Sequence, residues 1–324
     1  MGDGLLPVAG RASLQWLAGF RQACCLHRVA LFCLSSRKLL IRLGQCFLLN
    51  GLIFLGSLFF LNKVVIPMLS WILPDQCKEL AFQEICDSGA VIRFYSVLRS
   101  ILINLFYVFW FCPLYVLSFI LSSIWYNDIA KLTFEIFRQQ SGDSDNEGAV
   151  VGPHSVNHAD KPTGIEGVII GISEQVYSAL LLTIFYIEVV VTGYIPVIGK
   201  AINFVLLSWA YAYYSFEYKW NFSGLSLDKR LKLFELNWAF FAGFGSPCIL
   251  GIFFFPPLTS YGVLAILFPL FILVAIGTPE EQVITSQRRS WKGEGPTKLP
   301  IFYAANILSM KVLQLFPETD KKGQ

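Results

Sequence analysis

The feature that most constrains this chain is a set of long stretches without Asp, Glu, Lys or Arg. The longest has 44 residues and lies between Glu235 and Glu280. Two others, residues 43–62 and 100–127, have 20 and 28 residues. A helix of about 20 apolar residues crosses the hydrocarbon core of a bilayer. Only 15% of the chain is charged, against about 25% in soluble domains. The sequence therefore predicts an all-α polytopic membrane protein with about six membrane-embedded helices.

The longest stretch exceeds one crossing. At 1.5 Å per residue it would form a helix of about 66 Å, roughly twice the hydrocarbon thickness. Pro256 and Pro257 lie near its midpoint, and consecutive prolines remove two backbone donors and disfavour helix just before them. We therefore expect a hairpin of two helices, near residues 238–255 and 261–276.

The segment from Gln175 to Ser215 is harder to assign because Glu188 and Lys200 interrupt it. The uncharged runs that remain have at most 16 residues, which is short for full crossings. The turn from Gly193 to Gly199 is apolar, whereas a turn in water is usually polar. Two interpretations stay open: a hairpin of tilted crossings, or a re-entrant pair that turns inside the membrane.

The distribution of basic residues predicts the orientation. Six basic residues and one acidic residue precede residue 43, and seven basic residues follow Glu280. Lys and Arg concentrate on the cytosolic side, so both termini are expected there, which requires an even number of crossings. This divides the chain into a basic cytosolic region (1–42), a membrane domain (43–277) and a cytosolic tail (278–324).

Two cytosolic elements are expected inside the membrane domain. After the second crossing, apolar residues recur on one helical face, opposite a charged face, which predicts an interfacial amphipathic helix. The apolar face comprises Trp125, Ile129, Leu132 and Ile136. Residues 139–165 are rich in Ser, Gly, Asp and Asn, which is typical of a flexible loop.

Cys77 and Cys86 lie in the loop from Lys63 to Arg99, which this topology places in the lumen. A lumenal compartment is oxidising, so the two cysteines are candidates for a disulfide. The alternative is two free thiols.

Glu188 and Lys200 are the candidate functional residues inside the membrane. A carboxylate at membrane depth is costly unless it is paired, protonated or hydrated, so it indicates a functional site. The alternative is a carboxylate that reaches the headgroups. Lys200 is either its partner or a lysine that extends to the interface. The sequence contains no GxSxG, P-loop or HExxH pattern, and we expect no catalysis, cofactor, metal or nucleic-acid partner.

Several segments resemble the etoposide-induced protein 2.4 family of endoplasmic-reticulum membrane proteins. They are SIWYNDIAKLTFEI (123–136), SFEYKW (215–220), FELNWAFFAGFGSP (234–247) and ILFPLFIL (266–273). The resemblance covers roughly residues 46–275. It implies distant kinship with bacterial CysZ sulfate-uptake proteins, whose half-penetrating hairpins favour the re-entrant interpretation.

Two functions follow from this resemblance. In the first, the protein is a non-enzymatic endoplasmic-reticulum factor that supports autophagosome formation, with the lipid bilayer and proteins of the autophagy machinery as partners. In the second, it is a CysZ-like channel or transporter for a small anion such as sulfate. The sequence favours the first only weakly, because Lys200 is the one basic candidate well inside the charge-poor region.

Overall fold

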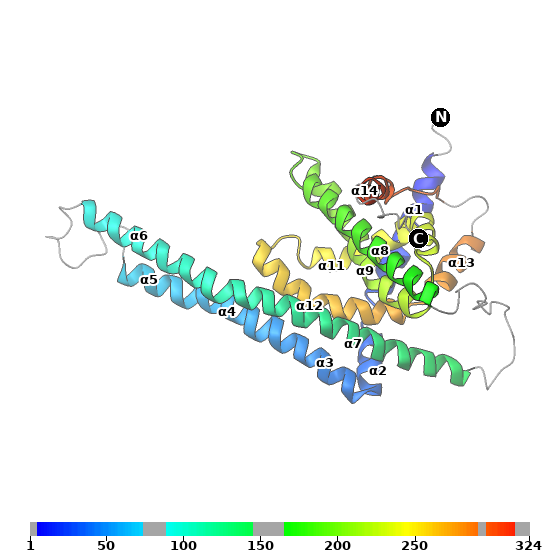
Figure 1. Cartoon of the computed structure of the whole chain (residues 1–324), viewed down its shortest axis with the longest axis horizontal. Coiled ribbons are helices and arrows are strands. Elements are labelled where there is room, and N and C mark those ends of the chain that lie inside the picture. Colours follow the sequence, from blue (N-terminus) through cyan, green and yellow to red (C-terminus); the bar gives the residue numbers. More distant parts are fainter. Residues whose placement is uncertain (1–4, 74–88, 145–164, 291–295, 315–324) are drawn as a thin grey trace, which may run out of the picture. The chain divides into compact units, whose positions relative to one another are not determined.

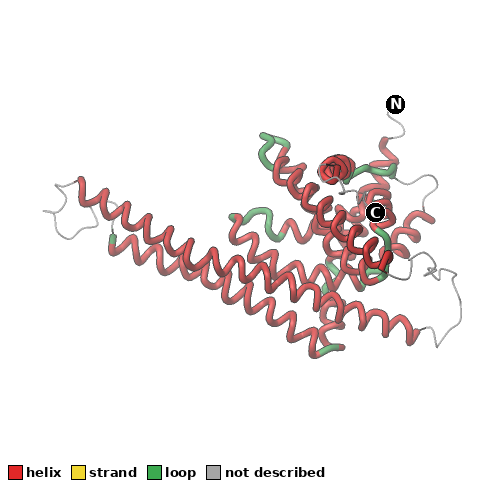
Figure 2. The backbone as a smooth tube through the Cα atoms, in the orientation of Figure 1, coloured by secondary structure: helices red, strands yellow, loops and turns green. Residues whose placement is uncertain are grey.

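The structure is a computed structural model that describes residues 5–73, 89–144, 165–290 and 296–314. Every regular element among them is helical (Figure 1, Figure 2). The α-helices are α1 (Leu5–Ala23), α2 (His27–Ser35), α3 (Arg37–Phe47), α4 (Gly56–Phe60), α5 (Ile66–Ile72), α6 (Gly89–Phe106), α7 (Cys112–Ser144), α8 (Ile165–Thr192), α9 (Gly199–Phe222), α10 (Leu227–Leu236), α11 (Trp238–Leu250), α12 (Pro257–Ile276), α13 (Glu280–Ser290) and α14 (Tyr303–Gln314). Among the described residues, three π-helical segments join consecutive helices without a break: η1 (Leu48–Leu55), η2 (Leu61–Val65) and η5 (Tyr107–Phe111).

Four helical stretches of the described chain are long and apolar enough to cross a membrane. They are Ala9–Ser35, Arg37–Ile72, Arg93–Gln140 and Pro257–Ile276. A fifth arises if α10 and α11, which meet at an 88° bend, count as one broken span. The predicted all-α polytopic membrane fold is confirmed.

The two crossings predicted at residues 43–62 and 100–127 lie within long continuous helical rods, Arg37–Ile72 and Arg93–Gln140. Pro113 lies at the start of α7, directly after η5. A proline in a helix lacks an N–H and its ring clashes with the carbonyl four residues earlier. The wider π-helical turn just before it provides the space, so the rod continues past the proline.

The stretch from Trp125 to Arg138 is not a separate interfacial helix, because it continues α7 without a break. Its amphipathic pattern is nevertheless present. Ile129 is buried, whereas Lys131, Glu135 and Arg138 are exposed.

The proline pair interrupts the helix as expected. The turn occupies residues 251–256, and Pro257 is the first residue of α12, a position where its missing N–H costs nothing. The first arm is shorter than predicted. The 13 residues of α11 span only about 20 Å, so this helix alone does not cross a bilayer.

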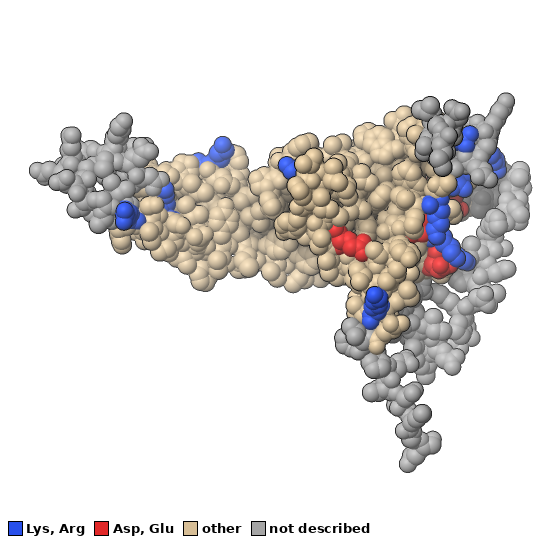
Figure 3. All heavy atoms as spheres, turned by 90° about the horizontal axis from the view of Figure 1, so that it is seen from above, with Lys and Arg blue, Asp and Glu red and all other residues tan. Residues whose placement is uncertain are grey.

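The chain forms two compact units, which we describe separately. Unit 2 contains residues 33–132 and 251–270. In it the rod from α3 to α5 lies antiparallel to the rod of α6, η5 and α7 (Figure 1). Arg42 pairs with Asp128 at one end (3.5 Å), and Arg99 donates to the Leu73 carbonyl at the other (3.4 Å). The face of these rods in Figure 3 shows a wide band without charged side chains, as expected for a surface in contact with lipid.

Unit 1 contains residues 1–32, 133–250 and 271–324. Its central helix is α11. Helices α1 and α9 pack so closely against α11 that their backbones approach its glycines. A Cβ atom on Gly243 would collide with the backbone of Trp16 in α1, and one on Gly245 with the backbone of Ser208 in α9. Small residues permit this close approach between helices in membranes, which explains the two glycines of the AGFGSP segment.

The N-terminal and C-terminal regions are not separate from this packing. Helices α1, α13 and α14 all belong to unit 1. The predicted divisions at 42/43 and 277/278 concern the side of the membrane on which each region lies, so they stay predictions.

Candidate functional site

Glu188 lies on α8, four residues before its end. Its Oε1 atom is buried and has no hydrogen-bond partner among the residues that the structure describes. Lys200 is the second residue of α9 and is exposed. The ion pairs among the described residues do not join these two side chains. The structure therefore places Glu188 and Lys200 on facing arms of one hairpin without a bond between them, and their functional role stays a prediction.

The turn between α8 and α9 exposes apolar side chains. Tyr194 is 83% exposed and Val197 is 98% exposed, and Val197 adopts a left-handed backbone conformation (φ 67°). Beneath the turn, the Asn203 side-chain amide donates to the Val189 carbonyl (2.6 Å) and joins the two arms. An apolar tip of this kind suits a lipid environment, as the re-entrant interpretation requires, and the choice between the two interpretations stays a prediction.

Cys77 and Cys86 lie outside the described residues. The disulfide between them stays a prediction.

A buried charge cluster, absent from the sequence predictions, joins four elements of unit 1. Lys219 of α9 forms an ion pair with Glu280 at the start of α13 (2.5 Å), and their side chains are only 12% and 6% exposed. Lys219 also donates to the Thr278 carbonyl (2.6 Å), and the Trp220 indole N–H donates to Glu280 Oε1 (3.2 Å). The Phe137 ring lies 5.6 Å from the ammonium. Each charge therefore has several partners, which a buried ion pair needs in order to offset its desolvation.

Arg28 of the N-terminal region bonds to residues beside this charge cluster. The Arg28 guanidinium donates to the Gly277 carbonyl and to the Thr278 hydroxyl, both at 3.0 Å. Residues 277–278, near the end of the 44-residue uncharged stretch, therefore bond to an arginine from α2 and a lysine from α9. Lys219 lies in SFEYKW, so the resemblance had drawn attention to it, but its partner is 61 residues away.

Glu217, in the same segment, is a second carboxylate that the sequence analysis missed. It accepts a hydrogen bond from Ser178 of α8 (3.1 Å). It lies outside the candidate spans. Burial raises the pKa of the Glu217 carboxyl, and the bond from Ser178 and the charge of Arg230 offset part of that rise. The contact joins the two arms of the hairpin far from the turn.

Unit 2 has a polar cluster inside its apolar band. Asn50 is fully buried, accepts from the Ser118 hydroxyl (2.5 Å) and donates to the Ser122 hydroxyl (2.9 Å). The Tyr261 hydroxyl of α12 lies 3.1 Å from that of Ser118. Hydrogen bonds between side chains of neighbouring helices stabilise membrane bundles, so this cluster sets the register of three helices.

The bend between α10 and α11, which residues 234–238 (FELNW) form, bonds to residues 288–302 of the C-terminal segment. Glu235 pairs with Lys298 (3.0 Å) and accepts from the Phe302 backbone N–H (3.3 Å). Asn237 accepts from Arg288 (2.9 Å), and the Trp238 indole donates to the Thr297 carbonyl (3.2 Å). The polar side chains of FELNW therefore hold the C-terminal segment of the same chain against the bend.

The Phe302 ring occupies an aromatic socket. It is 2% exposed, and its centroid lies 5.0 Å from that of Phe185, 5.3 Å from that of Tyr213 and 5.6 Å from that of Phe234. Four residues further along the chain, Asn306 of α14 accepts a hydrogen bond from Tyr177. The segment predicted as a tail is therefore docked on α8, α9 and α10.

Comparisons with known proteins agree with the resemblance noted in the sequence. Residues 25–269 match the family model described as "Sulfate transporter CysZ/Etoposide-induced protein 2.4". The chain is 60% identical over 306 residues to "Protein EI24 homolog" of Arabidopsis thaliana, covering 94% of this chain and 95% of the relative. It is 28% identical over 273 residues to the protein of the same name from Dictyostelium discoideum, covering 84% and 75%. No solved structure shows significant similarity to it. The chain belongs to the sulfate transporter CysZ/etoposide-induced protein 2.4 family.

Proposed function

We propose that this protein is a multi-pass membrane protein of the endoplasmic reticulum that supports autophagosome formation without catalysing a reaction. The similarity to an EI24 homolog over 94% of the chain carries the proposal, together with the autophagy role that the family resemblance implies. Proteins of the autophagy machinery are its proposed partners, and both termini are proposed to face the cytosol.

The bonding of three buried or half-buried basic side chains supports a structural rather than a transport role. Arg28, Lys219 and Arg230 each bond to acceptors of this chain: Arg28 to residues 277–278, Lys219 to Glu280, and Arg230 to the Leu225 carbonyl (2.6 Å) and Asn221 (2.5 Å). A basic side chain that carries an anion must exchange its partner for that anion. These three hold helices together instead.

Cells that lack the protein provide the test. Autophagic flux, measured as lysosomal or vacuolar turnover of a lipid-conjugated autophagosome marker, is expected to fall and to recover when the full chain is returned. A fluorescent tag should place the returned protein at the endoplasmic reticulum. Normal flux in the deficient cells, or a different organelle, would overturn the proposal.

A second candidate function is passage of a small anion, favoured by the family description, which includes the sulfate transporter CysZ. Purified protein in liposomes should then carry sulfate or chloride above the rate of empty liposomes. A flux equal to that of empty liposomes for both ions would exclude this candidate under those conditions and leave the first.

Replacing Glu188 tests the membrane site predicted from the sequence. We expect Glu188→Gln and Glu188→Ala to reduce autophagic flux in cells or anion flux in liposomes at normal protein level. The Glu188 Oε1 atom is buried without a hydrogen-bond partner among the described residues, and a carboxylate of this kind at membrane depth indicates a functional role. The matched control is Glu281→Gln, which changes an exposed carboxylate of α13. Full activity of both Glu188 variants would contradict the prediction and favour a carboxylate at the headgroups.

A further inference from the structure

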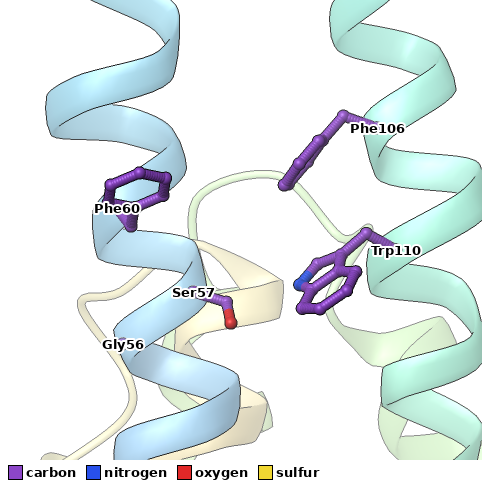
Figure 4. Close-up of a pocket in the computed structure, with 5 residues that line it drawn as sticks. All are labelled: Gly56, Ser57, Phe60, Phe106 and Trp110. Atoms are coloured by element: carbon purple, nitrogen blue, oxygen red, sulfur yellow. The ribbon is translucent and has the colours of Figure 1, made fainter.

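A groove of about 440 Å³ opens on the surface of unit 2, between the two long rods. Its lining residues are Gly56, Ser57 and Phe60 on one rod and Phe106 and Trp110 on the other (Figure 4). In Figure 4 the two aromatic side chains of the second rod extend toward Ser57 and Phe60. A volume of this size falls in the range of small-molecule sites, roughly 300–1,000 Å³.

Small residues on the first rod leave space for the groove. A Cβ atom on Gly56 would have as its nearest neighbour only the Gly51 carbonyl at 3.9 Å, so open space lies over this residue. Ser57 is small, and its hydroxyl already donates to the Ile53 carbonyl (2.5 Å). The π-helical segments η1 and η2 lie on either side of Gly56–Phe60 in the chain, and η5 contributes Trp110 to the lining.

The charges of unit 2 indicate the depth of the groove. From the Arg42–Asp128 ion pair to Lys63 the first rod has 20 uncharged residues, about 30 Å of helix and one hydrocarbon thickness. Ser57 precedes Lys63 by six residues, about 9 Å. The groove therefore lies just inside the membrane boundary marked by Lys63, where aromatic side chains such as Trp110 are enriched.

We propose that this groove binds one phospholipid molecule, with an acyl chain between Phe60 and Trp110 and the phosphate beside Lys63. The groove is lined by aromatic rings and surrounded by exposed apolar side chains, among them Phe59 and Phe109, so its occupant is a hydrocarbon chain of the bilayer. Lys63 is exposed, lies within one turn of Phe60 and has no ion pair among the described residues. Its charge favours a lipid with a phosphate over a neutral sterol.

The test uses the full chain in vesicles of phosphatidylcholine and phosphatidylglycerol with a trace of phosphatidylcholine that carries a diazirine in its acyl chain. After illumination, mass spectrometry of peptides locates the label. We expect labelling to concentrate at residues 56–60 and 106–110, and Gly56→Leu, which fills the groove, to lower it several-fold.

Two further variants make the result specific. Gly44→Leu is the matched control, because a Cβ at this glycine of the same rod also meets open space, and its labelling at the groove should equal that of the wild type. Lys63→Met keeps an unbranched side chain of nearly the same length but removes the charge, and should lower the amount of phospholipid that stays bound in native mass spectrometry.

Three outcomes would overturn the proposal. Equal labelling of Gly56→Leu and the wild type would mean ordinary bilayer lipid without a site. Displacement of the label by cholesterol but not by unlabelled phosphatidylcholine would make the occupant a sterol. Unchanged phospholipid retention in Lys63→Met would mean that Lys63 does not bind the phosphate. None of these measurements depends on autophagy, so the site and the proposed function are tested separately.

Discussion

Lys219→Met is expected to destabilise the folded protein by about 3–5 kcal/mol, because it leaves the Glu280 carboxylate buried without its counter-ion. Glu280→Gln should have a similar effect, since it leaves the Lys219 ammonium with the Thr278 carbonyl as its remaining oxygen partner. The double variant Lys219→Met/Glu280→Gln should recover part of the loss, because no unpaired charge remains. Thermal unfolding of the detergent-purified proteins measures all three.

The exposed ion pair between Lys232 and Asp228 on α10 is the matched control. It has good geometry (2.7 Å), but its side chains are 62% and 72% exposed. Lys232→Met should therefore cost only about 0.3–0.5 kcal/mol. A loss in Lys219→Met no larger than that in Lys232→Met would contradict the role assigned to the buried pair.

Phe302→Ala is expected to cost about 3–5 kcal/mol, the usual result of truncating a buried phenylalanine to leave a cavity. The ring fills the socket of Phe185, Tyr213 and Phe234, so its loss should also loosen the C-terminal segment. Unfolding midpoint and the rate of proteolysis after Lys298 are the measurements.

The neighbouring residue offers the control for this prediction. Tyr303 is also aromatic but is 64% exposed, so Tyr303→Ala should change stability far less. If both variants behave alike, the C-terminal segment is not anchored by the socket, and its docking on α8 to α10 must be reconsidered.

Features that depend on neighbouring residues in the chain were predicted well. A stretch without charge is apolar wherever it folds, and two adjacent prolines end a helix through local sterics. The two crossings at residues 43–62 and 100–127 and the turn before Pro257 were therefore foreseen, but the helices that contain these crossings, Arg37–Ile72 and Arg93–Gln140, extend well beyond them. The shortness of α11 was not, because its end at Leu250 precedes the prolines by several residues.

The candidate functional residues also fall into those that the sequence shows and those that only the structure reveals. Glu188 and Lys200 stand out in the sequence because a charge in an apolar run is visible without a structure. Asn50, Ser118 and Tyr261 do not, because uncharged polar residues are common in membrane helices and only their meeting makes a cluster.

The sequence by itself determined that the chain lies in a membrane, where its longest uncharged stretches lie and to which family it belongs, because hydrophobic length and local signatures need no tertiary contact. Only the tertiary structure decided that Lys219 pairs with Glu280, and that Glu235 and the Phe302 socket hold a segment predicted as part of a cytosolic tail. Those contacts join residues more than 60 positions apart. Such pairs depend on how whole helices pack, and a local pattern of residue types carries no record of that packing.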